Sequence, residues 1–597
     1  MTDPASIRAR HQAVRAEMER QNIDALVVPR ADEYLGEYIP ERNERLCWIS
    51  GFRGSAGMVF LLADRAALFV DGRYTEQARQ QTSAELFEYH HLIDEPHLPW
   101  LVKTLGSGKR VGYDPRLHTL AWQKRALEVL GAAGVELAAL ETNPVDACWT
   151  DRPPAERNAA LLLSEEFTGQ HSQDKRTAIA ASIVERGAEA ALIFATDSVA
   201  WLLNIRGSDV PHTPLLLGFA LIDSEGRVAL FTDPAKIPEG FAEHVGEGVT
   251  VRPESDAIEV FGNFKGKRVL ADPDTANAWC QLALIRAGAE LVAAQDPVIL
   301  PKACKNTVES AGMRAAHCRD GAAVCRFLAW LDAEVAAGRL HDEAVLANRL
   351  YDYRAADPLF RDTSFDTISA SGANAALAHY RHSDETPGRP TMNSIYLVDS
   401  GGQYLDGTTD ITRTVAIGEP DAERRRMFTL VLKGHIALDL ARFPKGTTGT
   451  QLDVLARQFL WQAGFDYDHG TGHGVGSFLS VHEGPQRIGK AWNPTELRPG
   501  MVISNEPGYY KSGAYGIRCE NLVLVKEAES VGPTPMYGFE AITLVPFDTR
   551  LLERSLLTAE EVGWINAYHA RVMEEVGPLL EGETLTWLRR ATRPMGR

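Results

Sequence analysis

The chain has 597 residues, of which 45% are hydrophobic and 24% are charged. That length is too great for one hydrophobic core and predicts three or four domains of a soluble globular enzyme. The net charge of −18 argues against a phosphate-binding surface, so nucleic acid is not expected as a partner.

The N-terminal residues lack the apolar segment of a signal peptide, and no apolar run approaches ~18 residues. We therefore expect neither export nor a membrane-spanning segment. The seven cysteines are scattered and contain no CxxC pair, which indicates reduced thiols and a cytoplasmic location. Cys519, next to Glu520, is predicted to face the opposite side of its strand as a packing residue.

Residues 1–155 are predicted to form an α/β domain, with an amphipathic helix over 7–21 leading into a buried strand over 24–29. A linker with two prolines follows at 150–158. Residues 156–302 repeat the order of helix, buried strand, glycine-bearing turn and hairpin, so we predict a second α/β domain that duplicates the first. Convergent βαβ patterning is the alternative explanation.

Residues 303–597 are predicted to form the catalytic domain, which makes the whole chain α/β (α+β) in class. Two helices are followed by a loop with histidine and a β-hairpin with two carboxylates, and then the same order recurs. This order predicts an internal pseudo-twofold symmetry with a site between the halves. The predicted helices span 307–337 and 341–355 in the first half, and 421–442 and 450–463 in the second.

Each predicted hairpin places one carboxylate on each of its strands. Asp399 and Asp410 belong to the first hairpin, and Glu506 and Glu520 belong to the second. Any one of them alone is typical of a turn or surface residue. All four, however, adjoin apolar strand runs, where an unpaired buried charge costs several kcal/mol, and no comparable set of cations lies nearby in sequence.

The glycine-rich stretch 469–476, HGTGHGVG, lies between the hairpins and carries His473. It does not fit a dinucleotide fingerprint, because Val475 occupies the place of the third glycine, and it has no Lys-Ser/Thr pair for a P-loop. Four carboxylates and an imidazole would instead suit two divalent cations of a hydrolase site. Oxygen ligands with one nitrogen favour manganese, while cobalt and zinc stay open.

These residues, with the phrases VDSGGQYLDGTTDITRT, HGTGHGVG, VHEGP, NEPGYY and GIRCEN, resemble the pita-bread-fold metallopeptidase family. Within that family the chain is similar to the long, three-domain cytosolic aminopeptidase P (X-Pro aminopeptidase) group over nearly its whole length. The resemblance implies a metal-ligand set consisting of Asp399, Asp410, His473, Glu506 and Glu520.

The resemblance also implies roles for each group. Asp410 and Glu520 would bridge the ions, and a metal-bridged hydroxide would attack the scissile carbonyl. Glu506 would handle its proton. Further catalytic side chains are implied at His379, His469, His482 and Arg518.

We therefore expect an aminopeptidase that releases the residue before a penultimate proline, and a homodimer. A prolidase-like X-Pro dipeptidase of the same fold is the alternative function. An inactive pita-bread binding module is a further alternative, but such modules lose metal ligands, whereas all five are present here. The preferred N-terminal residue and the physiological peptides are not predicted.

Overall fold

A computed structural model describes residues 3–382 and 386–596. The chain divides into two compact units, one comprising 1–163 and 170–299 and the other comprising 164–169 and 300–597. The predicted boundaries at 155/156 and 302/303 remain predictions. Within the described residues, no helix is both long enough and apolar enough to cross a membrane.

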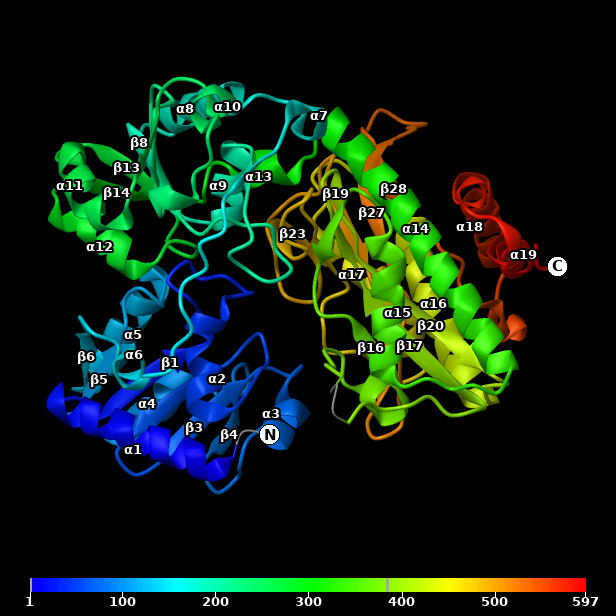
Figure 1. Cartoon of the computed structure of the whole chain (residues 1–597), viewed down its shortest axis with the longest axis horizontal. Coiled ribbons are helices and arrows are strands. Elements are labelled where there is room, and N and C mark those ends of the chain that lie inside the picture. Colours follow the sequence, from blue (N-terminus) through cyan, green and yellow to red (C-terminus); the bar gives the residue numbers. More distant parts are fainter. Residues whose placement is uncertain (1–2, 383–385, 597) are drawn as a thin grey trace. The chain divides into compact units, whose positions relative to one another are not determined.

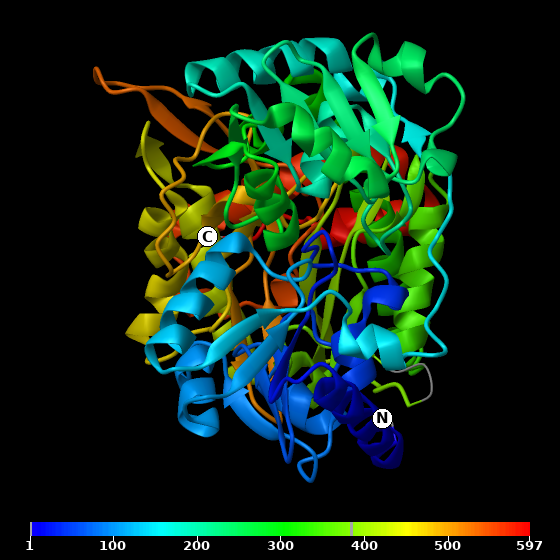
Figure 2. The same cartoon turned by 90° about the vertical axis from the view of Figure 1, so that its left-hand side faces the viewer.

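The first unit contains two six-stranded sheets, visible in the blue and the cyan-to-green parts of the chain (Figures 1 and 2). The first sheet has the order β4-β3-β2-β1-β5-β6, and the second has the order β12-β11-β10-β8-β13-β14. In both sheets, counted in these orders, the third strand pairs antiparallel with the second strand and with the fourth strand. All other neighbouring strands pair parallel. Two sheets with one topology confirm that the N-terminal domains are related α/β folds.

The strands of these sheets have the following bounds. The first sheet contains β1 (Ala25–Pro29), β2 (Met58–Leu62), β3 (Ala66–Val70), β4 (Glu88–His91), β5 (Arg110–Tyr113) and β6 (Glu136–Ala139). The second contains β8 (Ala190–Ile193), β10 (Phe219–Asp223), β11 (Val228–Phe231), β12 (Val249–Arg252), β13 (Arg268–Ala271) and β14 (Glu290–Ala293).

Strand β1 shows why these central strands are apolar throughout. Leu26 and Val28 pack with helix α1 (Pro4–Arg20) in one core cluster, and Ala25 and Val27 pack with helices α4 (His97–Leu105) and α5 (Leu120–Ala132) in another. Successive side chains of a strand point to opposite faces, so a sheet covered on both faces needs apolar residues at every position.

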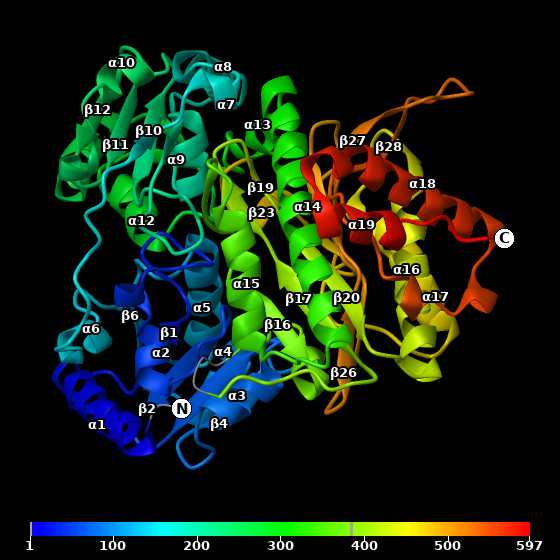
Figure 3. The same cartoon turned by 45° about the vertical axis from the view of Figure 1, so that its right-hand side comes forward.

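The second unit contains the two helix pairs that were predicted, and each pair packs on strands (Figure 3). Helices α14 (Thr307–Ala336) and α15 (Glu343–Ala355) belong to the first half, and α16 (Ala422–Asp439) and α17 (Gly449–Gln462) to the second. The predicted helix over 421–442 was too long, because Arg442 already begins strand β21 (Arg442–Pro444), which pairs with β28 (Met536–Ala541). Helices α18 (Ala559–Glu575) and α19 (Gly582–Ala591) close the chain.

The second unit has a three-stranded sheet, β16-β17-β20, and a six-stranded sheet, β21-β28-β27-β24-β22-β23. One buried cluster joins both sheets to all four helices and to α18 and α19. The strands not yet defined are β16 (Ile368–Ser371), β17 (Ser394–Ser400), β20 (Ile411–Ile417), β22 (Gly472–Gly474), β23 (Glu483–Ile488), β24 (Val502–Asn505) and β27 (Asn521–Ala528).

In the first unit, Asp32 is expected to make the stability of the fold dependent on pH. Its carboxyl is fully buried; Oδ1 accepts hydrogen bonds from the backbone N–H groups of Tyr34 (3.0 Å) and Gly36 (2.9 Å), and no described residue donates to Oδ2. Burial, and then the charge of Glu33, raise the pKa of Asp32 to about 7. A carboxyl with a raised folded pKa holds its proton better when folded, so stability falls as pH rises from about 4 to about 7.

The wild type should lose stability between pH 5 and pH 8, and Asp32→Asn should not. We therefore expect the free energy of unfolding of Asp32→Asn, relative to that of the wild type, to rise by on the order of 2–3 kcal/mol between pH 5 and pH 8. Urea unfolding at both pH values measures this difference. Asp24→Asn is the control, because the pKa of Asp24 is lowered and its carboxylate stays ionised across the same range. An equal effect of Asp32→Asn at both pH values would contradict the assignment.

Candidate metal centre

The first pair of carboxylates lies where β17 and β20 meet. Asp399 is on β17 and pairs with Thr412 of β20, and Asp410 precedes the first residue of β20. Asp410 was predicted to lie on the strand, and this was wrong by one residue. The ladder ends there because the chain turns at Gly401, where a side chain would lie 1.9 Å from the Thr409 carbonyl oxygen.

The second pair repeats this arrangement. Glu506 follows the last residue of β24, and Glu520 precedes the first residue of β27; both were predicted to lie on the strands. The last ladder pair is Asn505–Asn521, so the two glutamates extend from the ends of neighbouring strands. In each half a smaller hairpin is inserted: β18 (Gly402–Tyr404) with β19 (Gly407–Thr408), and β25 (Gly508–Lys511) with β26 (Tyr515–Arg518).

His473 lies on β22 and turns its ring toward both pairs. Its Nε2 atom is 3.4 Å from Asp410 Oδ2 and 3.6 Å from Glu506 Oε1. Ligand atoms of Asp410, His473 and Glu520 all lie within 4.8 Å of one another. The structure therefore brings residues from both hairpins and the glycine-rich stretch to one place.

Burial and neighbouring negative charges raise the pKa values of Glu520, Asp399 and Glu506. Burial, and then the charges of Asp410 and Asp399, hold the pKa of Glu520 well above its usual range. Burial raises the pKa of Asp399, although the Arg518 guanidinium acts against this, and burial raises the pKa of Glu506 to about 7. A cluster of like charges that is buried in this way is stabilised when cations lie among its members.

The pKa of His473 also shows that this cluster favours a positive charge. Burial disfavours its imidazolium form, but the hydrogen bond to Asp410 and the charge of Glu506 raise its pKa to about 9. A metal ion would displace that proton, because a histidine ligand must be neutral.

The donor atoms present fit a metal centre. Asp399 is 8% exposed, and its Oδ1 has no hydrogen-bond donor among the described residues, although the atom is buried. His473 Nδ1 lies 3.0 Å from the carbonyl oxygen of Gly474, to which it donates, so the nitrogen that faces the carboxylates and would bind a metal after losing its proton is Nε2. Carboxylate oxygens with one imidazole suit divalent ions of the manganese type.

A chain of hydrogen bonds leads from Asp399 to His469. Arg518 is buried and pairs through Nη2 with Asp399 Oδ2, and its Nη1 donates to the hydroxyl of Tyr510 (2.6 Å). His469 Nε2 lies 2.8 Å from the same hydroxyl. Arg518 thus joins the cluster directly through Asp399, and His469 joins it through Tyr510 and Arg518. Tyr510 was not singled out in the sequence interpretation.

Thr412 is a second residue that the sequence interpretation missed. Its hydroxyl donates to Glu520 Oε2 (2.7 Å) and accepts from Arg518 Nε (3.1 Å). It occupies the strand position opposite Asp399. No register was predicted for this hairpin from the sequence, and a register would have been the signal that identified Thr412.

His482 lies against His473, with ring centroids 4.3 Å apart and planes at 80°. The next residue, Glu483, is buried and accepts hydrogen bonds from Lys302 (2.6 Å) and Lys305 (2.5 Å). His379 is half-buried in the turn after the 3₁₀ helix η5 (Gly372–Ala376). The catalytic role of His379 remains a prediction.

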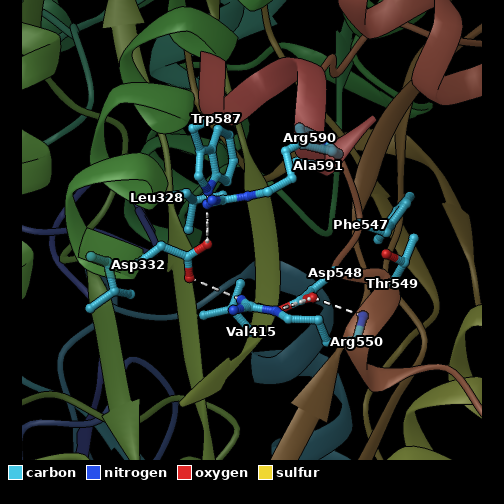
Figure 4. Close-up of a pocket in the computed structure, with 12 residues that line it drawn as sticks. Leu328, Asp332, Val415, Phe547, Asp548, Thr549, Arg550, Trp587, Arg590 and Ala591 are labelled. Carbon is cyan, nitrogen blue, oxygen red and sulfur yellow. Dashed lines mark hydrogen bonds and ion pairs between the residues drawn. The ribbon is translucent and has the colours of Figure 1, made fainter. Parts of the chain in front are cut away.

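A separate cavity of about 260 Å³ lies in the same unit among α14, β20, the segment 546–550 and α19 (Figure 4). Its polar side chains already pair with one another. Asp332 accepts hydrogen bonds from Trp587 (2.8 Å) and Arg550 (3.0 Å), and Arg550 also pairs with Asp548. None of the predicted site residues lines this cavity, so we assign it no catalytic role.

Family models match almost the whole chain. Residues 311–527 match metallopeptidase family M24, and residues 535–595 match the C-terminal region of peptidase M24. Residues 10–147 and 151–309 each match a creatinase/prolidase N-terminal domain. The fold, the family matches and the cluster of carboxylates with His473 thus define a metallopeptidase of the M24 class.

Full-length relatives narrow this class further. A Tuber melanosporum protein named "Probable Xaa-Pro aminopeptidase P" is 39% identical over 97% of both chains, and aminopeptidase P2 of Arabidopsis thaliana is 39% identical over 96% of this chain and 86% of its own. The chain belongs to the Xaa-Pro aminopeptidase P family. The predicted family and the predicted enzyme class, a metal-dependent peptide hydrolase, are confirmed.

Two solved structures show how much of the chain each architecture covers. The X-prolyl aminopeptidase of Caenorhabditis elegans, described as a cytosolic enzyme with a di-nuclear active site, superimposes with a TM-score of 0.94 at 34% identity over 99% of this chain and 100% of its own. The Xaa-Pro dipeptidase of Bacillus anthracis covers 63% of this chain and 99% of its own, with a TM-score of 0.51 and 25% identity. These comparisons confirm the predicted fold class.

Proposed function

We propose that this protein releases the N-terminal residue from peptides whose second residue is proline, using two divalent metal ions. The observation that supports this most directly is the gathering of Asp410, His473 and Glu520 beside Asp399 and Glu506, in a chain whose full-length relatives carry that activity in their names. The di-nuclear site described for the Caenorhabditis elegans enzyme supports the number of ions.

The proposed ligand roles are those that the resemblance implies, and the gathering of Asp410, His473 and Glu520 supports them. Asp410 and Glu520 would each contact both ions, Asp399 would hold one ion, and His473 with Glu506 would hold the other. When bound, the ions lower the pKa of a water molecule so that hydroxide is available near neutral pH to attack the scissile carbonyl. We propose Glu506 as the acceptor of that water's proton, because its carboxylate borders the site.

The remaining side chains are proposed to bind and orient the substrate. His379 and His482 would donate hydrogen bonds to the carbonyl oxygen as negative charge develops on it. The free α-amine would bind near Asp399, whose carboxylate is held in place by Arg518. His469, joined to Arg518 through Tyr510, would stabilise this arrangement.

A prolidase-like X-Pro dipeptidase is the second candidate. The dipeptidase of Bacillus anthracis shares the fold of 63% of this chain, whereas the aminopeptidase of Caenorhabditis elegans covers 99%. The additional α/β domain therefore favours the aminopeptidase.

The experiment tests whether cleavage requires a free N-terminus and proline as the second residue. With manganese present, we expect Arg-Pro-Pro to be cleaved after arginine, N-acetyl-Arg-Pro-Pro to resist, and Arg-Ala-Ala to be cleaved roughly 10–200-fold more slowly, because the proline ring supplies about 1–3 kcal/mol of apolar contact. Initial rates by mass spectrometry measure all three. Cleavage of the acetylated peptide, or a preference for alanine, would contradict the proposal, and a preference for Gly-Pro over Arg-Pro-Pro would favour the dipeptidase.

We further propose manganese as the metal, a cytoplasmic location and a homodimer. The oxygen-rich ligand set supports manganese, and the cytosolic Caenorhabditis elegans enzyme supports the location. The homodimer is proposed from the resemblance to the aminopeptidase P group. Activity after refilling metal-stripped enzyme with single metals, and the mass in solution, test the first and last of these proposals.

A further inference from the structure

Glu343, the first residue of α15, is fully buried, and its carboxylate collects hydrogen bonds from one segment of the chain. Oε1 accepts from the backbone N–H (2.7 Å) and the hydroxyl (2.8 Å) of Ser371 and from the side-chain amide of Asn374 (3.1 Å). Oε2 accepts from the hydroxyl of Tyr380 (2.7 Å) and the backbone N–H of Gly388 (3.0 Å). The backbone N–H of Glu343 donates to the Gly388 carbonyl oxygen (2.9 Å).

Neutral donors alone satisfy this charge. None of the ion pairs among the described residues includes Glu343, whereas Glu483 has two lysines. A buried carboxylate without a cation is tolerated only when several donors converge on it, and its place in the first turn of a helix adds the favourable helix dipole. A side chain at Gly388 would come within 2.6 Å of this carboxylate, so the position is shaped for close approach.

The segment held by Glu343 borders the metal centre. Ser371 ends β16, and this strand pairs with β17 so that Ile368 lies opposite Asp399. Helix η5 follows and packs on β26, where a side chain at Gly516 would lie 1.7 Å from the Ala375 carbonyl oxygen. Strand β26 ends at Arg518, the partner of Asp399.

His379 lies between the anchored positions and immediately precedes Tyr380. The Tyr380 hydroxyl also accepts a hydrogen bond from Asn374 (2.9 Å). Hydrogen bonds of Tyr380 to Asn374 and to Glu343 therefore hold the turn that carries His379. We propose that Glu343 is a positioning residue that fixes His379 for the reaction. This proposal rests on the role given to His379 in the proposed function.

The test is a double-mutant cycle of Glu343→Gln and His379→Ala. Glutamine keeps the shape of the side chain but replaces one acceptor oxygen by an NH₂ group that opposes the existing donors. We expect Glu343→Gln to lower kcat on Arg-Pro-Pro by about 10–100-fold, the cost of a small misplacement, with KM changed less than about twofold. In the His379→Ala background the same substitution should change kcat by less than about twofold.

A second measurement does not depend on activity. Modification of His379 by diethyl pyrocarbonate, followed by mass spectrometry, reports how firmly the half-buried ring is held. We expect Glu343→Gln to speed this modification several-fold and Tyr380→Phe, which removes a single donor, to have a smaller effect in the same direction. Metal content should stay at the wild-type value in both variants.

Glu561→Gln is the matched control, because Glu561 is also a buried carboxylate in the first turn of a helix, where it pairs with Lys433 and caps α18. It should leave kcat and the modification of His379 unchanged. Equal effects of Glu343→Gln on kcat with and without His379, or an unchanged rate of modification of His379, would overturn the proposal. The proposed function would still stand if the wild type cleaved Arg-Pro-Pro.

Discussion

Replacing Glu520 or Asp410 by alanine is expected to abolish peptide cleavage and to lower metal occupancy well below two ions per chain. Both side chains are buried, at 2% and 3% exposure, and lie in the group whose ligand atoms are within 4.8 Å of one another. A carboxylate between two ions serves both, so its loss weakens both. Elemental analysis of the purified variant, together with the rate on Arg-Pro-Pro, measures the result.

The stability of the Glu520→Gln variant shows whether lost activity comes from lost metal or from misfolding. Because Asp410, Asp399 and Glu506 repel the charge of Glu520, Glu520→Gln should leave the metal-stripped protein at least as stable as the wild type. The rise in Tm that manganese produces in the wild type should disappear in this variant. Glu527→Ala, an exposed position on the same strand β27, should retain both metals and full activity. Two tightly held ions in folded Glu520→Ala would contradict the ligand assignment.

The repeated order of elements was predictable because it depends on local pattern. The apolar runs before Asp399 and Glu506 predicted the strands β17 and β24, and the return runs after Asp410 and Glu520 predicted β20 and β27. Period-two alternation and glycine-marked turns determine such hairpins locally. The five proposed metal ligands were therefore identified before their distances were known.

The exact ends of the strands were not predictable in the same way. The chain leaves the ladder at Gly401 because a neighbouring carbonyl oxygen excludes any side chain there, and this close approach is a tertiary contact. The short inserted hairpins β18–β19 and β25–β26 also depend on tertiary contacts. Strand β18 pairs with β15 (Phe360–Thr363) as well as with β19, and an isolated hairpin as short as β25–β26 is marginally stable.

Residues that act through long-range hydrogen bonds were also missed. Tyr510 joins His469 and Arg518 across separations of 41 and 8 residues, and Glu343 reaches Tyr380 across 37. Nothing in the local pattern distinguishes such a tyrosine or glutamate from a surface residue. Only the folded arrangement shows which donors and acceptors meet.

Replacing His482 by alanine is expected to slow turnover by about 10²–10³-fold, the usual cost of losing one donor to a developing oxyanion. Its ring lies 4.3 Å from that of His473, the proposed metal ligand, so in the proposed function it is close to the reacting carbonyl. The loss should fall on kcat, because a donor to the oxyanion acts mainly in the transition state. Steady-state kinetics on Arg-Pro-Pro with manganese measure it.

Metal content decides between this role and a structural one. If His482 donates to the substrate, His482→Ala keeps two ions per chain and loses only rate. If the ring instead supports His473 by packing, the variant loses metal together with activity, and excess manganese restores the rate. Glu483, fixed by Lys302 and Lys305, holds the backbone next to His482, so the alanine variant should keep the strand in place. Wild-type turnover with both metals bound would show that His482 does not take part in the reaction.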